Sequence, residues 1–149
     1  MRNATIISVL LLLTIWTVLN SQYTYMDLNL PGTYGSMVSF GDYNQDEDLD
    51  MVLSGSVEMS GLGQTYLFDN QGNFNFTAVN PPFMDVFHSF VDWTDYNNDG
   101  YLDAIVCGVP YLNANPVTKV YKGLMNGQFI EIPQTFVGAD NASAEWGDY

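Results

Sequence analysis

The sequence predicts an all-β protein made of a repeated, four-stranded antiparallel unit, and three observations carry this prediction. An acidic stretch occurs twice, as DYNQDEDLD at 42–50 (loop 1) and DYNNDGYLD at 95–103 (loop 2), with starts 53 residues apart. A short apolar run follows each copy, and a hairpin signal follows each run. Beyond the N-terminal segment, no stretch shows the 3.6-residue period of an amphipathic helix. A fixed period of this length is typical of repeat architectures.

The repeat extends toward the end of the printed sequence. Asp148 follows Asp95 by another 53 residues, and aromatic residues keep the same spacing: Phe40, Trp93 and Trp146 each stand two residues before the corresponding aspartate. Asp148 is therefore the possible start of a third loop. We place one domain at 22–149, with units at about 33–82 and 86–135 and the start of a third at about 139–149.

Each unit reads as four short strands. One strand enters the acidic loop, and a buried strand leaves it as MVL (51–53) or AIVC (104–107). Hairpins follow at 65–79 and 117–132, the latter around an Asn-Gly pair that is a strong turn signal.

Four-stranded units with such a period are typical of β-propeller blades, which stack face to face. An incomplete propeller leaves two blade faces bare, and we expect Val52, Leu53, Ile105 and Val106 on them. A two-sheet sandwich is the alternative.

The acidic loops predict a cation site. Carboxylates placed this closely repel one another unless a cation offsets the repulsion. Side chains at positions 1, 3 and 5, a backbone carbonyl at position 7 and a carboxylate at position 9 can converge on one point. The predicted ligands are Asp42, Asn44, Asp46, Asp48 (carbonyl) and Asp50 in loop 1, and Asp95, Asn97, Asp99, Tyr101 (carbonyl) and Asp103 in loop 2.

Oxygen ligands without histidine or cysteine favour Ca²⁺ over zinc or copper. Mg²⁺ is the alternative, although it demands a stricter octahedron. At position 6, where the chain must bend sharply, loop 2 has Gly100 and loop 1 has Glu47, which adopts a left-handed conformation at a cost of about 1 kcal/mol. An EF-hand is excluded because its twelfth position falls on Leu53 and Val106. A solvated turn that binds nothing is the remaining alternative.

Composition and charge narrow the function classes. The 149 residues are 47% hydrophobic and 15% aromatic, enough for a packed core. A net charge of -14 disfavours binding to nucleic acid or to an anionic membrane surface. His88 and Cys107 are the only histidine and cysteine. We interpret them as a partly buried loop residue and a core residue, and we find no catalytic group, so we expect a non-enzymatic protein.

The N-terminus indicates export. Arg2 precedes an uncharged apolar run, Ala4 to Leu19, which predicts a signal peptide at 1–21. An uncleaved signal anchor is the alternative. The sequons at Asn75 and Asn141 are glycosylation candidates in a secreted protein.

Taken together, the loops resemble the FG-GAP/VCBS repeat family, the integrin-α-type propellers, over about residues 30–149. That family has a D-x-[DN]-x-[DN]-G-x-x-D calcium loop, an apolar strand and often Gly-Ala-Pro. Gly108-Val109-Pro110 follows loop 2 and Tyr34-Gly35 stands at the Phe-Gly position, whereas Gly55-Ser56 and Phe87-His88 depart from the pattern.

The resemblance implies a seven-bladed propeller with structural calcium on one edge and a role in extracellular adhesion or recognition of a protein or glycan. Two alternatives stay open, a non-catalytic propeller region of a larger secreted enzyme and an ectodomain spacer. Contact with a membrane is expected only through an N-terminal anchor or a segment after Tyr149.

Overall fold

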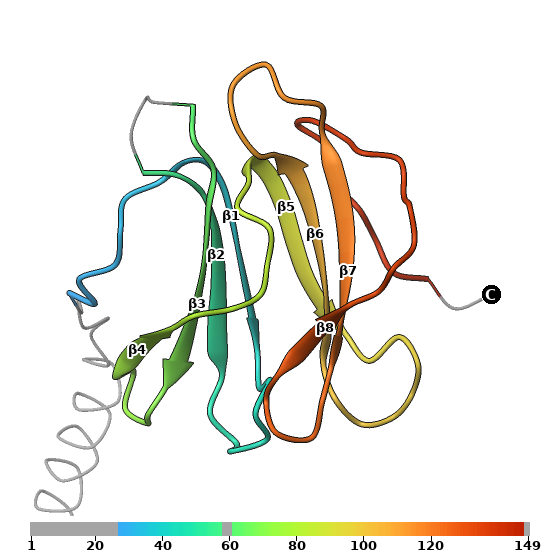
Figure 1. The fold of residues 1–149 in the computed structure, drawn as a ribbon. Coiled ribbons are helices and arrows are strands. Elements are labelled where there is room, and N and C mark those ends of the chain that lie inside the picture. The colour runs from blue at the N-terminus through green and yellow to red at the C-terminus, as the bar shows by residue number, and fades with distance from the viewer. Residues whose placement is uncertain (1–26, 58–60, 148–149) are drawn as a thin grey trace, which may run out of the picture.

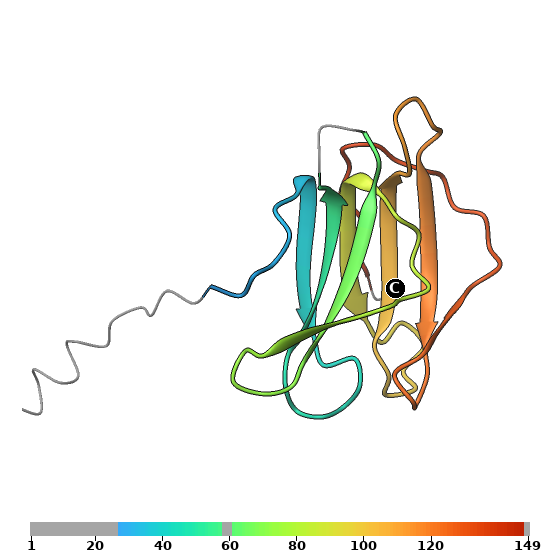
Figure 2. The same cartoon turned by 60° about the vertical axis from the view of Figure 1, so that its left-hand side comes forward.

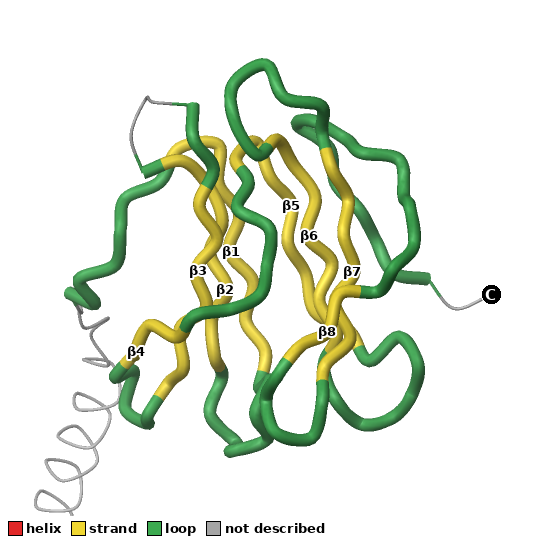
Figure 3. The backbone as a smooth tube through the Cα atoms, viewed as in Figure 1, coloured by secondary structure: helices red, strands yellow, loops and turns green. Residues whose placement is uncertain are grey.

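The structure, a computed structural model, describes residues 27–57 and 61–147, which form two four-stranded sheets (Figures 1 and 3). The first sheet contains β1 (Tyr34–Gly41), β2 (Asp50–Ser56), β3 (Gln64–Asn70) and β4 (Phe76–Val79), and the second contains β5 (Phe87–Thr94), β6 (Asp103–Val109), β7 (Val117–Gly123) and β8 (Phe129–Glu131). The all-β prediction is confirmed for these residues. None of them belongs to a helix that could cross a membrane. The predicted signal segment at 1–21 lies outside them.

The two sheets are copies of one another in topology and register. Each is an antiparallel meander in which consecutive strands are neighbours. Tyr34 pairs with Ser56 in the first sheet, and Phe87 pairs with Val109 in the second, each residue exactly one period further on. A register shift follows both pairs. The sheets are not closed into a ring, but each has the four-stranded form of a propeller blade.

One face of the second sheet packs on the opposite face of the first, with β5 beside β1 (Figure 1), and Figure 2 shows the two sheets from another side. Trp93 of β5 and Phe129 of β8 both stack on Tyr43, at ring-centroid distances of 6.4 and 5.8 Å. Val52 and Val91, both fully buried, belong to the same core. The contact is therefore head to tail: equivalent sheets use different faces.

This packing corrects the expectation about bare blade faces. Val52 and Val106 are fully buried, while Leu53 and Ile105 are half-buried. Within the described residues, an exposed apolar face of the first sheet instead carries Val38, Phe40, Leu49 and Phe74. Phe40, Leu49 and Phe74 line a shared hollow with Phe76. The error arose because the central strands were taken as the outer surface, whereas the edge strand β1 and the loops provide it.

Two smaller expectations are also wrong. In the hairpin at 65–79, the alternation of Phe74, Phe76 and Ala78 with polar residues predicts a strand that includes Phe74. Phe74 instead lies in the turn before β4, with φ of 59°, because Gln71 N–H donates to the Asn75 carbonyl and closes a longer loop. His88 is an exposed residue of β5 rather than a partly buried loop residue. Its φ of 48° matches the 53° of Gly35 one period earlier. The departure from Phe-Gly therefore keeps the backbone conformation.

The start of the third unit has no strand in the described residues, yet it repeats one contact. Trp146 stacks on Tyr96 at 6.0 Å and 11°. Trp93 stacks on Tyr43 at 6.4 Å and 12°, one period earlier. The same tryptophan–tyrosine contact thus joins each unit to the one before it.

Candidate metal site

Both acidic loops lie at the same end of the sheets, at the lower edge of Figure 1, where they join the first strand of each sheet to the second. Gln45 of loop 1 donates through Nε2 to the Gly100 carbonyl of loop 2. The repeat therefore places the two loops side by side on one edge.

The two loops share one hydrogen-bond pattern. The carboxylate at position 1 accepts hydrogen bonds from the backbone N–H groups at positions 5 and 6. The donors to Asp42 are Asp46 and Glu47, each at 3.0 Å, and those to Asp95 are Asp99 at 2.9 Å and Gly100 at 2.8 Å. The side-chain oxygen at position 3 accepts from the same N–H of position 5. These bonds fold the backbone around the side chains that were predicted as ligands.

The position-9 carboxylates are the buried acids of the loops, at the start of the second strand of each sheet. Asp50 and Asp103 are fully buried, and each accepts two backbone N–H bonds. Asp50 accepts from Tyr43 at 3.2 Å and Asn70 at 2.8 Å, and Asp103 accepts from the equivalent residues one period on, at 3.0 and 2.8 Å. The bonds from Asn70 and Gly123 tie each loop to the third strand of its own sheet, and those from the two tyrosines close the loop on itself.

Burial raises the pKa of Asp50 to about 6, although the two N–H donors favour its charged form. The nearby carboxylates of Asp46 and Asp69 raise this pKa further by repulsion. Burial likewise raises the pKa of Asp103. Without a counter-ion, each buried carboxylate is therefore an electrostatic cost.

Loop 1 brings its three carboxylates together. Asp42, Asp46 and Asp50 each offer one oxygen, and these oxygens lie within 4.8 Å of one another. Two oxygens that bind one Ca²⁺ at about 2.3–2.6 Å can be at most about 4.6–5.2 Å apart. The all-oxygen donor set and this spacing are therefore compatible with one Ca²⁺ bound by all three carboxylates.

Position 6 has the backbone conformation that its sequence pattern predicted. Glu47 has φ of 75° and Gly100 has φ of 87°. Position 4 also has positive φ in both loops, at Gln45 and at Asn98. Glu47 carries the steric cost of a left-handed conformation that Gly100 avoids.

Loop 2 has the same backbone but does not gather its acids as closely among the described residues. Lys122 of β7 places Nζ 2.8 Å from Oδ2 of Asp99. The Lys122 ammonium lowers the pKa of the Asp99 carboxyl. The Lys122 ammonium is thus bound to the predicted ligand at position 5 of loop 2.

Sequence reasoning missed Lys122 and its counterpart Asp69. Asp69 of β3 stands one period before Lys122, and its Oδ1 accepts from Asn44 Nδ2 at 3.1 Å. Aligning the third strands of the two units, and not only the loops, would have found an acid and a lysine at the same position.

The remaining predicted residues lie where the loops place them. Asn44 Nδ2 also donates to Asp46, at 3.1 Å. Asp48 and Tyr101 donate their N–H groups to the position-5 carboxylates, at 3.0 and 3.1 Å. Asn97 Oδ1 accepts a hydrogen bond from the Asp99 N–H, at 2.9 Å.

Other predicted residues lie away from the loops or outside the described chain. Asp148 lies outside the described residues. Asn75 is exposed. Asn141 is exposed too, with its amide 3.2 Å from Asp140 Oδ1.

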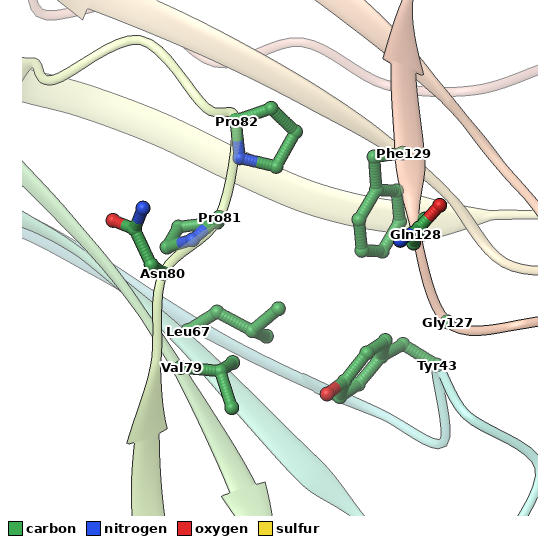
Figure 4. A pocket seen from close by; sticks show the side chains of 9 residues that line it. All are labelled: Tyr43, Leu67, Val79, Asn80, Pro81, Pro82, Gly127, Gln128 and Phe129. Atoms are coloured by element: carbon green, nitrogen blue, oxygen red, sulfur yellow. The ribbon is translucent and has the colours of Figure 1, made fainter.

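A hollow of ≈ 370 Å³ lies beside loop 1 at the junction of the sheets (Figure 4). The rings of Tyr43 and Phe129 face Leu67 and Val79 across it, and Asn80, Pro81, Pro82, Gly127 and Gln128 complete the lining. Tyr43 connects the hollow to loop 1, because its N–H donates to Asp50.

The two residues considered for catalysis have ordinary structural partners. Cys107 is buried, and its Sγ lies 3.3 Å from the Ala139 carbonyl. His88 is exposed and places Nδ1 3.2 Å from Asp140 Oδ1.

Comparison with known proteins gives one match. Residues 42–106 match the family model of the FG-GAP-like repeat. Searches of curated proteins and of solved structures found no match. The matched segment begins at Asp42, the first predicted ligand of loop 1, includes all of loop 2 and ends within β6. The chain therefore carries an FG-GAP-like repeat at residues 42–106, the family that its acidic loops resemble.

Proposed function

We propose that this chain is a calcium-binding, β-propeller-type module in which the cation is structural. The observation that carries the proposal is the convergence of Asp42, Asp46 and Asp50, with oxygens within 4.8 Å of one another. The carboxylates form this group at the edge of a sheet, where they repel one another unless a cation offsets the repulsion. Loop 2 repeats the backbone of this site one period later.

The residues of the chain would hold the ion as follows. Asp42, Asn44 and Asp46 supply side-chain oxygens, Asp48 supplies its carbonyl, and Asp50 closes the shell from below. The N–H donors already bound to Asp42 and Asp50 occupy only part of their lone pairs, since each carboxylate has about four acceptor sites. The ion supplies positive charge that offsets the burial of Asp50.

The bound cation would stabilise the folded chain by mass action, because the unfolded chain has no assembled site. It would also fix the β1–β2 connection, which holds the Tyr43 ring against Trp93 and Phe129. Metal binding and packing between the sheets are therefore linked through one residue.

Calorimetric titration of CaCl₂ into the purified, chelator-treated chain tests this proposal. We expect two binding events, and loss of one of them in Asp42→Asn. Asp27→Asn is the matched control, because Asp27 is an exposed acid outside both loops. Equal heats for the wild type and for the double variant Asp42→Asn/Asp95→Asn would reject calcium binding.

We further propose an extracellular, non-catalytic role in recognising a protein or glycan. The export signal predicted at 1–21 and the sequons support the location. The hollow beside loop 1 supports recognition, since it combines two aromatic rings with the amides of Asn80 and Gln128. A non-catalytic region of a larger secreted enzyme and a structural spacer are the alternatives.

Mass spectrometry of the chain expressed in a eukaryotic secretory cell tests the location. We expect a mature N-terminus near Gln22 and added glycan mass at Asn75. A product that keeps Arg2 in the membrane fraction would support the signal anchor instead, and retention of the intact chain in the cytosol would reject export.

A further inference from the structure

We propose that Lys122 is a tethered cation of loop 2, which makes the two loops unequal calcium sites. Loop 2 would keep its shape without metal and bind Ca²⁺ weakly, whereas loop 1 would depend on external Ca²⁺ and bind it tightly. The inference rests on the proposed calcium binding for the ranking of affinities. The neutralisation of loop 2 by Lys122 is independent of it.

The geometry of the ammonium group is the first support. Lys122 Nζ lies 2.8 Å from Asp99 Oδ2, the carboxylate at position 5 of loop 2. This distance is that of a charge-assisted hydrogen bond. A positive charge of the chain is therefore already bound to one predicted ligand.

The equivalent position of loop 1 is the second support. Asp69 stands one period before Lys122, and the strands that carry them have the same register against their neighbours, since Asp69 pairs with Thr77 and Lys122 with Ile130. Loop 1 thus has an additional carboxylate where loop 2 has an ammonium. This exchange alone changes the local charge by two, and loop 1 also carries Glu47 and Asp48 where loop 2 has Gly100 and Tyr101.

The position-3 asparagines respond to this difference. Asn44 Nδ2 donates to Asp46 and to Asp69, at 3.1 Å each. Asn97 has no such acceptor in the third strand, because Lys122 stands where Asp69 stands beside loop 1. The exchange of one side chain in the third strand therefore changes the hydrogen bonding inside the loop.

Electrostatics gives the direction of the effect. A divalent cation in loop 2 is repelled by Lys122, and the same cation in loop 1 is attracted by Asp69. At a separation near 5 Å in a solvated site, a repulsion of this kind corresponds to about a tenfold change in affinity. Loop 1 should accordingly fill first as Ca²⁺ is added.

Two lysines of β7 provide a matched pair of variants. Lys122→Met removes the charge beside loop 2 and keeps most of the side-chain stem. Lys119→Met removes the same charge from the same strand, but Lys119 pairs with Glu131 and not with a loop residue. Both are made in the Asp42→Asn chain, so that titration with CaCl₂ reports loop 2.

We expect Lys122→Met to tighten Ca²⁺ binding about tenfold, with less than a twofold change for Lys119→Met. In chelator, Lys122→Met should lower the melting temperature by about 3 °C, because the acids of loop 2 lose their only neutralising partner among the described residues. Lys119→Met should lower it less. Equal Ca²⁺ affinities for the two variants would overturn the ranking of the sites.

A reciprocal change in loop 1 keeps the proposal falsifiable. Asp69→Lys should weaken Ca²⁺ binding to loop 1 at least tenfold and raise the melting temperature in chelator. Unchanged values would reject the proposal. If no variant gives calcium heats, the proposed function fails and so does the ranking of the sites. The melting comparison in chelator then still decides whether Lys122 neutralises loop 2.

Discussion

Phe40 and Trp93 occupy the same position in two equivalent sheets, yet Phe40 is 53% exposed and Trp93 only 9% exposed. Each lies two residues before an acidic loop, near the end of the first strand of its sheet. The two strands also pair in the same register with the second strand. They differ in what lies against them, because Trp93 packs on Tyr43 of the preceding sheet. The repeat therefore determines where a side chain points, and the neighbouring unit determines whether that side chain is buried.

The two loops make the same point for charge. Their backbone conformations and the hydrogen bonds donated by their backbone N–H groups coincide, but Asp69 faces loop 1 and Lys122 faces loop 2. A difference in the third strand thus changes the electrostatics of a loop between the first two strands.

The largest expected effect separates Trp93 from Phe40. Trp93→Ala should reduce the free energy of unfolding by about 3–5 kcal/mol, because it opens a cavity in the core between the sheets. Phe40→Ala should cost less than about 1 kcal/mol, since the ring is mainly solvated. Urea unfolding of both variants measures the difference. Similar costs would mean that the Phe40 face is covered in solution.

Self-association should depend on the exposed apolar face of the first sheet. Phe40→Ser should lower the apparent mass of the chain in light scattering, because contiguous exposed apolar residues drive association. Val137→Ser is the control, as Val137 is 92% exposed but lies apart from this face. A wild-type chain that is monomeric at all concentrations would contradict this expectation.

The pH dependence of stability should change sign with calcium. The pKa of Asp50 is about 6 in the folded chain, against an ordinary value of 3.8. The folded state therefore binds more protons between these values, and in chelator the chain should become more stable as pH falls from about 6 to 4. In excess Ca²⁺ the chain should become less stable over the same range, because protons compete for the ligands.

Thermal melts at several pH values, with chelator and with CaCl₂, measure both slopes. The two curves should converge near pH 4. Parallel curves would show that no ligand proton is displaced by the cation.

The smallest expected effect concerns position 6 of the loops. Glu47→Gly should stabilise the chain by about 1 kcal/mol, and Gly100→Ala should destabilise it by a similar amount, because both residues have positive φ. A Cβ at Gly100 meets no atom within 4 Å, so its cost is conformational alone. Chemical denaturation of the two variants checks the opposite signs.

The sequence predicted those features that repeat. The interval from Asp42 to Asp95 predicted the two units, the apolar runs and hairpin signals predicted the four strands of each, and the family resemblance implied that the loops lie on one edge. The left-handed conformation at Glu47 followed from the glycine at the same position in loop 2. These predictions depend on the spacing of residues along the chain, and the same spacing occurs in both units.

Features that depend on the neighbouring sheet could not be predicted in this way. The burial of Val52 and the exposure of Phe40 follow from head-to-tail packing, which pairs unlike faces of like sheets. The turn at Phe74 follows from a hydrogen bond that closes a longer loop than its sequence indicated. The ion pair of Lys122 with Asp99 joins residues from different strands, and no motif within loop 2 indicates it.

The central claim is that the acidic loops are cation sites that stabilise the fold, and the melting temperature of the chain at pH 7 tests it most directly. Chelator-treated samples are compared with samples in CaCl₂ at equal ionic strength, with MgCl₂ as the control for divalent charge. We expect Ca²⁺ to raise the melting temperature by several degrees, because a free Ca²⁺ concentration of about one hundred times Kd stabilises the folded state by about 2.7 kcal/mol. We expect a smaller rise with Mg²⁺. The same melting temperature in chelator and in CaCl₂ would contradict the account.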